Sequence, residues 1–143
     1  MLSLRVNDYD MAFAERGSGI PLLLLHGGFV DLRLWAPQMD DFGARSRTIA
    51  VSSRRCWPER WNGEGAGYTT QQHVSDIAGF IDALGEKPVH LLGASLGAHV
   101  AFRVAQRFPD LIRALVLIEP AGPFDKGLEP PNPSYARNWV MGT

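Results

Sequence analysis

Gly93-Ala94-Ser95-Leu96-Gly97 is the stretch of this sequence that decides the fold. The apolar run at residues 88–92 precedes it, and apolar residues at helical spacing follow it until Pro109. This order predicts a buried strand, a sharp turn that lifts the Ser95 hydroxyl clear of the sheet, and a helix. The glycines permit the turn because larger side chains would not fit where strand and helix pack so closely. Gly-x-Ser-x-Gly is a weak signal alone, but this setting favours Ser95 as a positioned nucleophile over a plain glycine-rich turn.

A second glycine turn, His26-Gly27-Gly28-Phe29, ends the most hydrophobic strand of the sequence. Parallel sheets carry their ligand-facing loops at this end of the strands, so both turns are expected at one sheet edge. The backbone N–H of Gly28 or Phe29 is then expected to form half of an oxyanion hole, with the Leu96 N–H as the other half. The alternative is a simple turn between a strand and a helix, which the shared edge makes the weaker interpretation.

The remaining apolar segments predict a three-layer α/β/α fold with a mostly parallel sheet. Residues 20–25 form a continuous apolar run, which is typical of a strand buried on both faces. Residues 2–6 and 11–14 predict a hairpin at a sheet edge, and residues 48–51 and 111–118 predict two further strands. Strands that alternate with helices favour parallel pairing through right-handed crossovers.

Helical spacing marks two further segments. Trp35, Met39 and Phe42 predict a helix with Pro37 in its first turn. Thr69 and Gln72 match a capping box, and Gly85 stands where a C-terminal cap glycine belongs. The helix between these caps carries one apolar stripe, made of Val74, Ile77, Ala78, Ile81 and Leu84.

Composition is that of an ordinary globular protein of 143 residues, with 45% hydrophobic residues, 20% charged residues and a net charge of −1. The balanced charge argues against nucleic acid or an anionic membrane surface as a partner. The longest apolar run is far shorter than a membrane span requires, and the N-terminus lacks a signal-peptide pattern. Cys56 is the single cysteine, so no internal disulfide can form, and we expect a cytoplasmic protein.

Residues 1–122 resemble the N-terminal part of the α/β-hydrolase superfamily. The resemblance is carried by the stretches at residues 22–28, 93–97 and 113–120, in the order and at the approximate spacing of that superfamily. It implies a serine hydrolase acting on a small-molecule ester-like or other acyl substrate through an acyl-enzyme, with no cofactor and no metal. Ala94 and Ala98 depart from common patterns of the superfamily, at positions that do not carry the reaction.

The resemblance implies a triad in the order serine, acid, histidine, and this chain supplies it only in part. Glu119 is a possible acid, because some relatives place the acid at the end of this strand, although most place it after a later one. The alternative is a loop carboxylate. His99 is the single histidine after Ser95, and it lies about one turn along the helix, which makes it a poor base.

The other histidines are expected to have structural roles. His26 belongs to its turn, His73 is expected on a helix surface, and His90 in a strand. The loop at residues 53–61 interleaves arginine and tryptophan, and is either a substrate-entrance loop or an aromatic-anchored surface loop. No base is placed to make Cys56 a nucleophile.

Residues 123–143 are expected to begin a lid or tail segment, in which residues 138–141 start a helix. We expect a chain truncated after the strand at residues 111–118, which would leave that strand as an exposed sheet edge. Such a chain is expected to be marginally stable, dimeric through this edge, or completed by a partner chain. Two rivals to an active hydrolase follow: a non-catalytic binding protein that keeps the pocket, and a half-subunit that needs a complementary chain.

Overall fold

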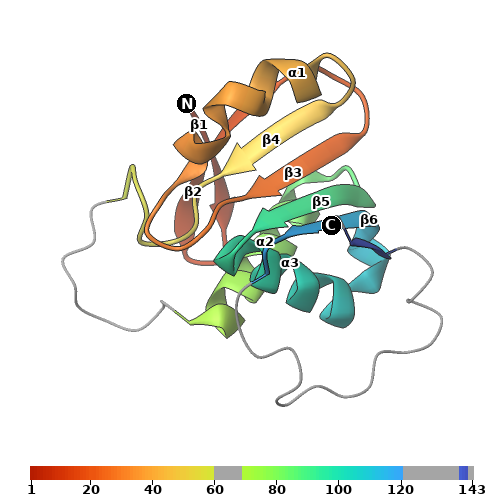
Figure 1. The fold of residues 1–143 in the computed structure, drawn as a ribbon. Helices are drawn as coiled ribbons and strands as arrows, with labels where there is room; N and C mark the ends of the chain where they lie inside the picture. The colour runs from red at the N-terminus through yellow and green to blue at the C-terminus, as the bar shows by residue number, and fades with distance from the viewer. Residues whose placement is uncertain (60–68, 121–138, 142–143) are drawn as a thin grey trace.

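A seven-stranded sheet runs through the described part of the chain, which is residues 1–59, 69–120 and 139–141 of a computed structural model (Figure 1). Its spatial order is β1-β2-β4-β3-β5-β6-β7. The pairs β1–β2 and β2–β4 are antiparallel, and all other neighbours are parallel. The prediction of a mostly parallel sheet is therefore confirmed. The strands are β1 (Leu2–Val6), β2 (Tyr9–Arg16), β3 (Pro21–Leu25), β4 (Arg47–Val51), β5 (Val89–Ala94), β6 (Ile112–Ile118) and β7 (Trp139–Met141).

The β1–β2 hairpin forms the sheet edge that the sequence predicted. Asn7 turns the chain with a φ of 52°, a backbone conformation that asparagine tolerates better than most residues. β2 extends to Arg16, beyond the predicted residues 11–14, because it also pairs with β4 as far as Arg16 opposite Thr48.

β3 lies in the middle of the sheet and is buried on both faces. Leu23 and Leu25 pack with helices α2 (Thr70–Leu84) and α3 (Leu96–Arg107). Leu24 faces the opposite layer, which the helices η1 (Leu32–Gln38) and α1 (Met39–Gly43) form. The three layers are visible in Figure 1, with α1 on one side of the sheet and α2 and α3 on the other. The continuous apolar run of β3 reflects this double burial.

Two of the helix termini follow the predicted caps, with one difference. Thr69 accepts a hydrogen bond from the Gln72 N–H at 3.1 Å, and Gly85 ends α2 with a φ of 74°. The Gln72 side chain donates to the Asp76 carboxylate at 2.9 Å, so the capping box is formed only in its first half.

The segment predicted as one helix around Trp35 is a 3₁₀ helix followed by a short α-helix. Pro37 lies inside η1, and α1 begins at Met39. Pro37 has no N–H to donate, so regular α-helical bonding is established only beyond it. The predicted helical spacing is nevertheless correct in its burial, because Trp35 and Met39 both face the sheet.

The C-terminal end of the described chain differs from the prediction in two ways. Trp139–Met141 is strand β7 and not the start of a helix, and it pairs with Leu115–Leu117 of β6. β6 is therefore not the sheet edge. Without β7, the outer backbone groups of β6 would be unpaired and would offer a template for a further strand, and tryptophan and valine favour strand conformation. Residues 121–138, which contain most of the predicted lid segment, lie outside the described residues.

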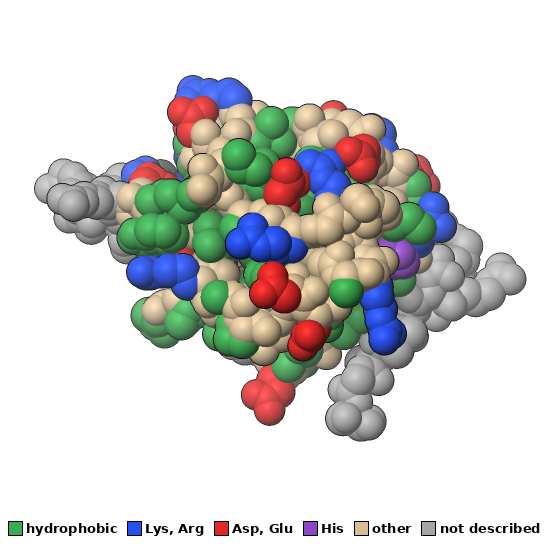
Figure 2. Space-filling view, turned by 90° about the horizontal axis from the view of Figure 1, so that it is seen from above, with side chains coloured by type: hydrophobic (Ala, Val, Ile, Leu, Met, Phe, Trp, Pro, Cys, Tyr) green, Lys and Arg blue, Asp and Glu red, His purple; other side chains and the backbone are tan. Residues whose placement is uncertain are grey.

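The described surface carries no field of one charge on the face seen in Figure 2, where acidic and basic side chains are interspersed. Among the helices of the described ranges, none combines the length and the apolar character needed to cross a membrane.

Candidate active site

Ser95 stands at the junction of β5 and α3, in the sharp turn that the sequence predicted. Its φ of 52° and ψ of −116° lie in a region that residues with a side chain rarely adopt. Ser95 is exposed, while its neighbours Gly93 and Gly97 are buried. The turn therefore presents the serine outward from a closely packed base.

The two elbow glycines are required by the packing around them. A Cβ atom on Gly93 would overlap the carbonyl group of Gly97. A Cβ atom on Gly97 would overlap the carbonyl oxygens of Leu25 and His26 at the end of β3. The start of α3 is thus pressed against both β5 and the turn after β3, which is the close packing inferred from the sequence.

The turn after β3 lies directly beside the elbow. A Cβ atom on Gly27 would lie 3.4 Å from the Ser95 Cβ atom and 3.9 Å from its Oγ atom. A Cβ atom on Gly28 would lie 3.7 Å from the Leu96 side chain. Phe29 follows with a φ of 63° and a fully exposed side chain. The structure thus brings together the two turns whose N–H groups were predicted to form the oxyanion hole.

His26 is buried in this turn and bonds to the protein through both ring nitrogens. Its Nδ1 atom lies 2.7 Å from the carbonyl oxygen of Gly27, and its Nε2 atom lies 3.0 Å from the backbone nitrogen of Ser53. Burial lowers the pKa of His26, although the bond to Gly27 and the nearby Asp31 carboxylate oppose that shift. His26 thus lies in the turn, as predicted, and joins it to the loop after β4.

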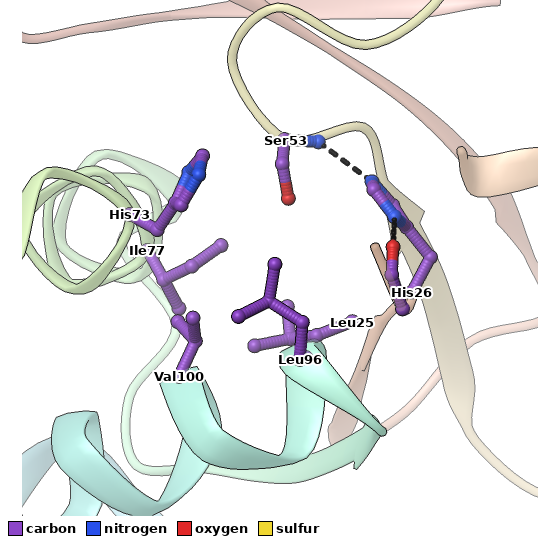
Figure 3. A pocket seen from close by; sticks show the side chains of 9 residues that line it. Leu25, His26, Ser53, His73, Ile77, Leu96 and Val100 are labelled. Carbon is purple, nitrogen blue, oxygen red and sulfur yellow. Dashed lines mark hydrogen bonds between the residues drawn. The ribbon is translucent and has the colours of Figure 1, made fainter. Parts of the chain in front are cut away.

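A pocket opens beside the elbow, between the turn after β3, the loop after β4 and the helices α2 and α3 (Figure 3). Its base is apolar, and the hydroxyl of Ser53 points into it. The lining residues are Leu25, His26, Gly27, Ser53, His73, Ile77, Leu96, Gly97 and Val100.

His73 lines this pocket, so its predicted place on a helix surface is wrong. The residue is only 4% exposed, and burial lowers the pKa of its imidazole. The sequence held a signal for this position, because His73 lies four residues before Ile77 and therefore on the same helical face as the apolar stripe.

The loop after β4 is anchored by a buried arginine that the sequence did not reveal. Arg54 binds Asp76 of α2 through two hydrogen bonds of 2.9 and 3.0 Å, and Asp8 of the hairpin through one of 2.6 Å. Its guanidinium also lies 4.1 Å from the ring centre of Tyr9. This part of the loop is a structural anchor, and residues 60 and 61 of the predicted loop lie outside the described residues.

The other candidate groups are placed as follows. Glu119 directly follows β6 and is exposed, with a φ of 43°. His99 is buried in α3, its backbone N–H donates to the Ser95 carbonyl oxygen at 3.1 Å, and burial lowers its pKa. His90 lies half-buried in β5, as predicted. Burial also raises the pKa of the Cys56 thiol.

Within the described ranges, no group of three or more His, Cys, Asp or Glu residues is placed to hold a metal ion.

Comparisons with known proteins agree with this geometry. A sequence model described as the alpha/beta hydrolase fold matches residues 20–140. The chain is 34% identical over 111 residues to a 2-(acetamidomethylene)succinate hydrolase of Mesorhizobium japonicum, covering 73% of this chain and 37% of that protein. It is 30% identical to a 2-hydroxymuconate semialdehyde hydrolase of a Pseudomonas species, covering 85% of this chain and 46% of the relative.

A solved structure of a membrane phospholipase A superimposes with a TM-score of 0.79 at 29% identity, over 85% of this chain and 39% of that one. The chain thus spans less than half the length of each of these proteins. The match covers the elbow, the turn after β3 and most of the sheet, and the chain belongs to the α/β-hydrolase fold family.

Proposed function

We propose that this chain carries the nucleophile and the oxyanion hole of a serine hydrolase that cleaves small ester-like or other acyl substrates. The observation that carries the proposal is the exposed Ser95 in a strained elbow, side by side with the glycine turn after β3. Strained backbone of this kind persists only where the surrounding structure holds it in place, and it is concentrated at active sites. The curated relatives include hydrolases of two small organic substrates, which is consistent with the proposed class.

In the proposed reaction the Ser95 Oγ atom attacks the substrate carbonyl carbon and forms a tetrahedral intermediate. The N–H of Leu96, at the start of α3, and the N–H of Gly28 or Phe29 stabilise the negative oxygen. The intermediate collapses to an acyl-enzyme as the alcohol or other leaving group departs with a proton. Water then attacks the acyl-enzyme, releases the acid and restores the Ser95 hydroxyl.

Serine as the nucleophile argues for an acyl substrate. A carboxylate nucleophile attacks saturated carbon and forms an ester with the enzyme, as haloalkane dehalogenases and epoxide hydrolases require. A serine hydroxyl activated by a base attacks carbonyl carbon instead. Ester-like bonds, and carbon–carbon bonds next to a carbonyl group, are therefore the proposed targets.

Both chemical steps need a base that takes and returns a proton. His99 is buried and joined to Ser95 through the backbone of α3, and we assign no base role to it. The other histidines precede the elbow in buried or half-buried positions. The proposal therefore assigns the base to a histidine other than the four of this chain.

Glu119 is retained in the proposal as the possible acid of the triad. It follows Ile118, whose carbonyl oxygen accepts the Ser95 N–H at 2.9 Å, so its backbone is close to the elbow. Glu119→Gln separates the two interpretations of this residue. In a protein that also supplies the histidine base, a triad acid predicts a large loss of serine-dependent turnover at unchanged stability, and a loop carboxylate predicts no loss.

The first experiment is hydrolysis of p-nitrophenyl acetate and butyrate by the purified chain and by its Ser95→Ala variant. A second arm adds imidazole as a diffusible base. Turnover that depends on Ser95 in either arm supports the proposal, and turnover only with imidazole indicates a competent nucleophile that lacks its base. Equal rates for both proteins in both arms would contradict a nucleophilic role of Ser95.

A further inference from the structure

We infer that His26 is the positioning residue of the oxyanion hole, because its ring fixes the plane of the peptide that carries the Gly28 N–H. The inference rests on the proposed function and deepens it. His26 touches no substrate in this scheme and acts only through the backbone of the glycine turn.

The two partners of the imidazole determine its protonation. The carbonyl oxygen of Gly27, at 2.7 Å, can only accept a hydrogen bond, so Nδ1 must carry the proton. The backbone N–H of Ser53, at 3.0 Å, can only donate, so Nε2 must be bare. Figure 3 shows both bonds, one on each side of the ring. Only the neutral Nδ1–H tautomer satisfies both partners.

The bond to Gly27 has a consequence for the next amide group. In a trans peptide the carbonyl group and the following N–H lie in one plane and point in opposite directions. His26 holds the Gly27 carbonyl toward its own ring, and the Gly28 N–H is therefore directed away from the ring. A peptide between two glycines is free to rotate in the absence of such a bond, since neither residue restricts its dihedral angles strongly.

The imidazole can hold the Gly27 carbonyl group in one orientation because the ring is itself held in place by its surroundings. His26 as a whole is 4% exposed, and its backbone oxygen packs against Gly97 of the elbow. Ser53, which supplies the second bond, precedes Arg54 and its buried bonds to Asp76. A continuous set of contacts thus runs from α2 through the loop after β4 to the oxyanion turn.

Two isosteric replacements separate the two bonds of the ring. The Nδ2 atom of asparagine can occupy the place of Nδ1 and donate to the Gly27 oxygen, which leaves the Ser53 N–H without its partner. The Oε1 atom of glutamine can reach the place of Nε2 and accept from Ser53, which leaves the Gly27 carbonyl free to turn. Each variant loses one buried hydrogen bond, so a purely structural role predicts similar damage from both.

The test measures two properties of the purified chain and of the variants His26→Asn, His26→Gln and His90→Gln. The first is the Ser95-dependent hydrolysis of p-nitrophenyl acetate, with imidazole added where the chain needs a base. His26→Gln is expected to lower kcat by about 10- to 100-fold at nearly unchanged KM, since a misdirected oxyanion donor weakens only the transition state. His26→Asn is expected to lose clearly less, and His90→Gln serves as the control for loss of an imidazole.

The second property is the NMR spectrum of the isotope-labelled chain, which requires no catalysis. A proton on Nδ1 of His26, a Gly28 amide signal that stays in place in His26→Asn, and one that moves in His26→Gln are the expected results. A proton on Nε2, or equal shifts of the Gly28 signal in both variants, would overturn the inference. Absence of Ser95-dependent hydrolysis with the expected spectra would count against the proposed function and leave the role of His26 intact.

Discussion

The backbone N–H of Ser95 donates a hydrogen bond of 2.9 Å to the carbonyl oxygen of Ile118, so the elbow is joined to β6 as well as to its own strand β5. This bond is the last backbone hydrogen bond between the two strands, and it lies directly beyond the pairing of Ala94 with Ile118. The strained backbone of Ser95 is held in place by this hydrogen bond and by the close packing at Gly93 and Gly97. The strain itself can be measured by substitution.

Replacement of Ser95 by glycine is expected to stabilise the chain relative to Ser95→Ala. A residue with a side chain at a φ of 52° and a ψ of −116° costs about 1–3 kcal/mol, and glycine is nearly free of this cost. Part of the gain is lost because glycine is more flexible in the unfolded chain, so a net difference of about 1 kcal/mol is expected. Urea unfolding of both variants measures it, and equal stability would show that the elbow is unstrained.

Gly97→Ala is expected to destabilise the chain strongly, by about 3 kcal/mol or more. Its methyl group would overlap the carbonyl oxygens of Leu25 and His26, which belong to the central strand and its turn and cannot move aside. Gly28→Ala is the matched control for stability, because its methyl group would meet nothing closer than 3.7 Å. Thermal melting of the two variants tests the prediction, and a similar loss in both would contradict the packing described here.

The Arg54–Asp76 pair is expected to behave as a buried ion pair. Both side chains are at most 8% exposed, so Arg54→Met should cost about 3–5 kcal/mol by leaving the Asp76 carboxylate without an opposite charge. Asp76→Asn should cost less, because Arg54 keeps its bond to Asp8. The double variant should cost less than the sum of the two. Asp8→Asn is the control, because the Asp8 side chain is 78% exposed and its substitution should change stability little. Additive losses in the double variant would show that the pair is not coupled.

Stability is expected to fall as the pH falls below about 6.5. Burial lowers the pKa of His26 and His73 in the folded chain, so the unfolded chain binds protons first. Their contribution is present in full above the unfolded value of about 6.5, and it is lost as the pH falls toward the folded values. Asp76 opposes the shift of His73, while His26 and Arg54 add to it.

His73→Gln removes one of these two groups and should therefore flatten the dependence. Melting temperatures at pH 7.5 and pH 5 for the chain and for this variant provide the measurement. A variant that loses as much stability on acidification as the unchanged chain would exclude His73 as a contributor.

The sequence predicted the parts of this fold that local patterns determine. The glycines around Ser95 and the continuous apolar run of β3 follow from contacts within or next to one element, and both were predicted correctly. The hairpin at the sheet edge follows in the same way from alternation and a turn.

The missed features depend on partners far away along the chain. Asp76 is buried in α2, but nothing in the neighbouring sequence identifies Arg54, 22 residues earlier, as its partner. β7 exists because β6 offers an open edge, and a short segment adopts the conformation that a neighbour can pair with. The two turns of the site were predicted at one sheet edge, but the bond between His26 and Ser53, which joins the glycine turn to the loop after β4, appears only in three dimensions.

The pairing register of β3 on β5 determines how the two turns of the site are aligned. Leu25 pairs with Gly93, and both Gly27 and Ser95 lie two residues beyond that pair, so the elbow and the glycine turn end level with each other. A slip of one residue would displace one turn by about 3.3 Å and reverse the faces of a strand buried on both sides. The distance between the elbow and the glycine turn is thus determined by the strand pairing in the sheet and not by the loops. An exposed side chain on either turn, such as that of Phe29, can therefore be replaced without a change in this alignment.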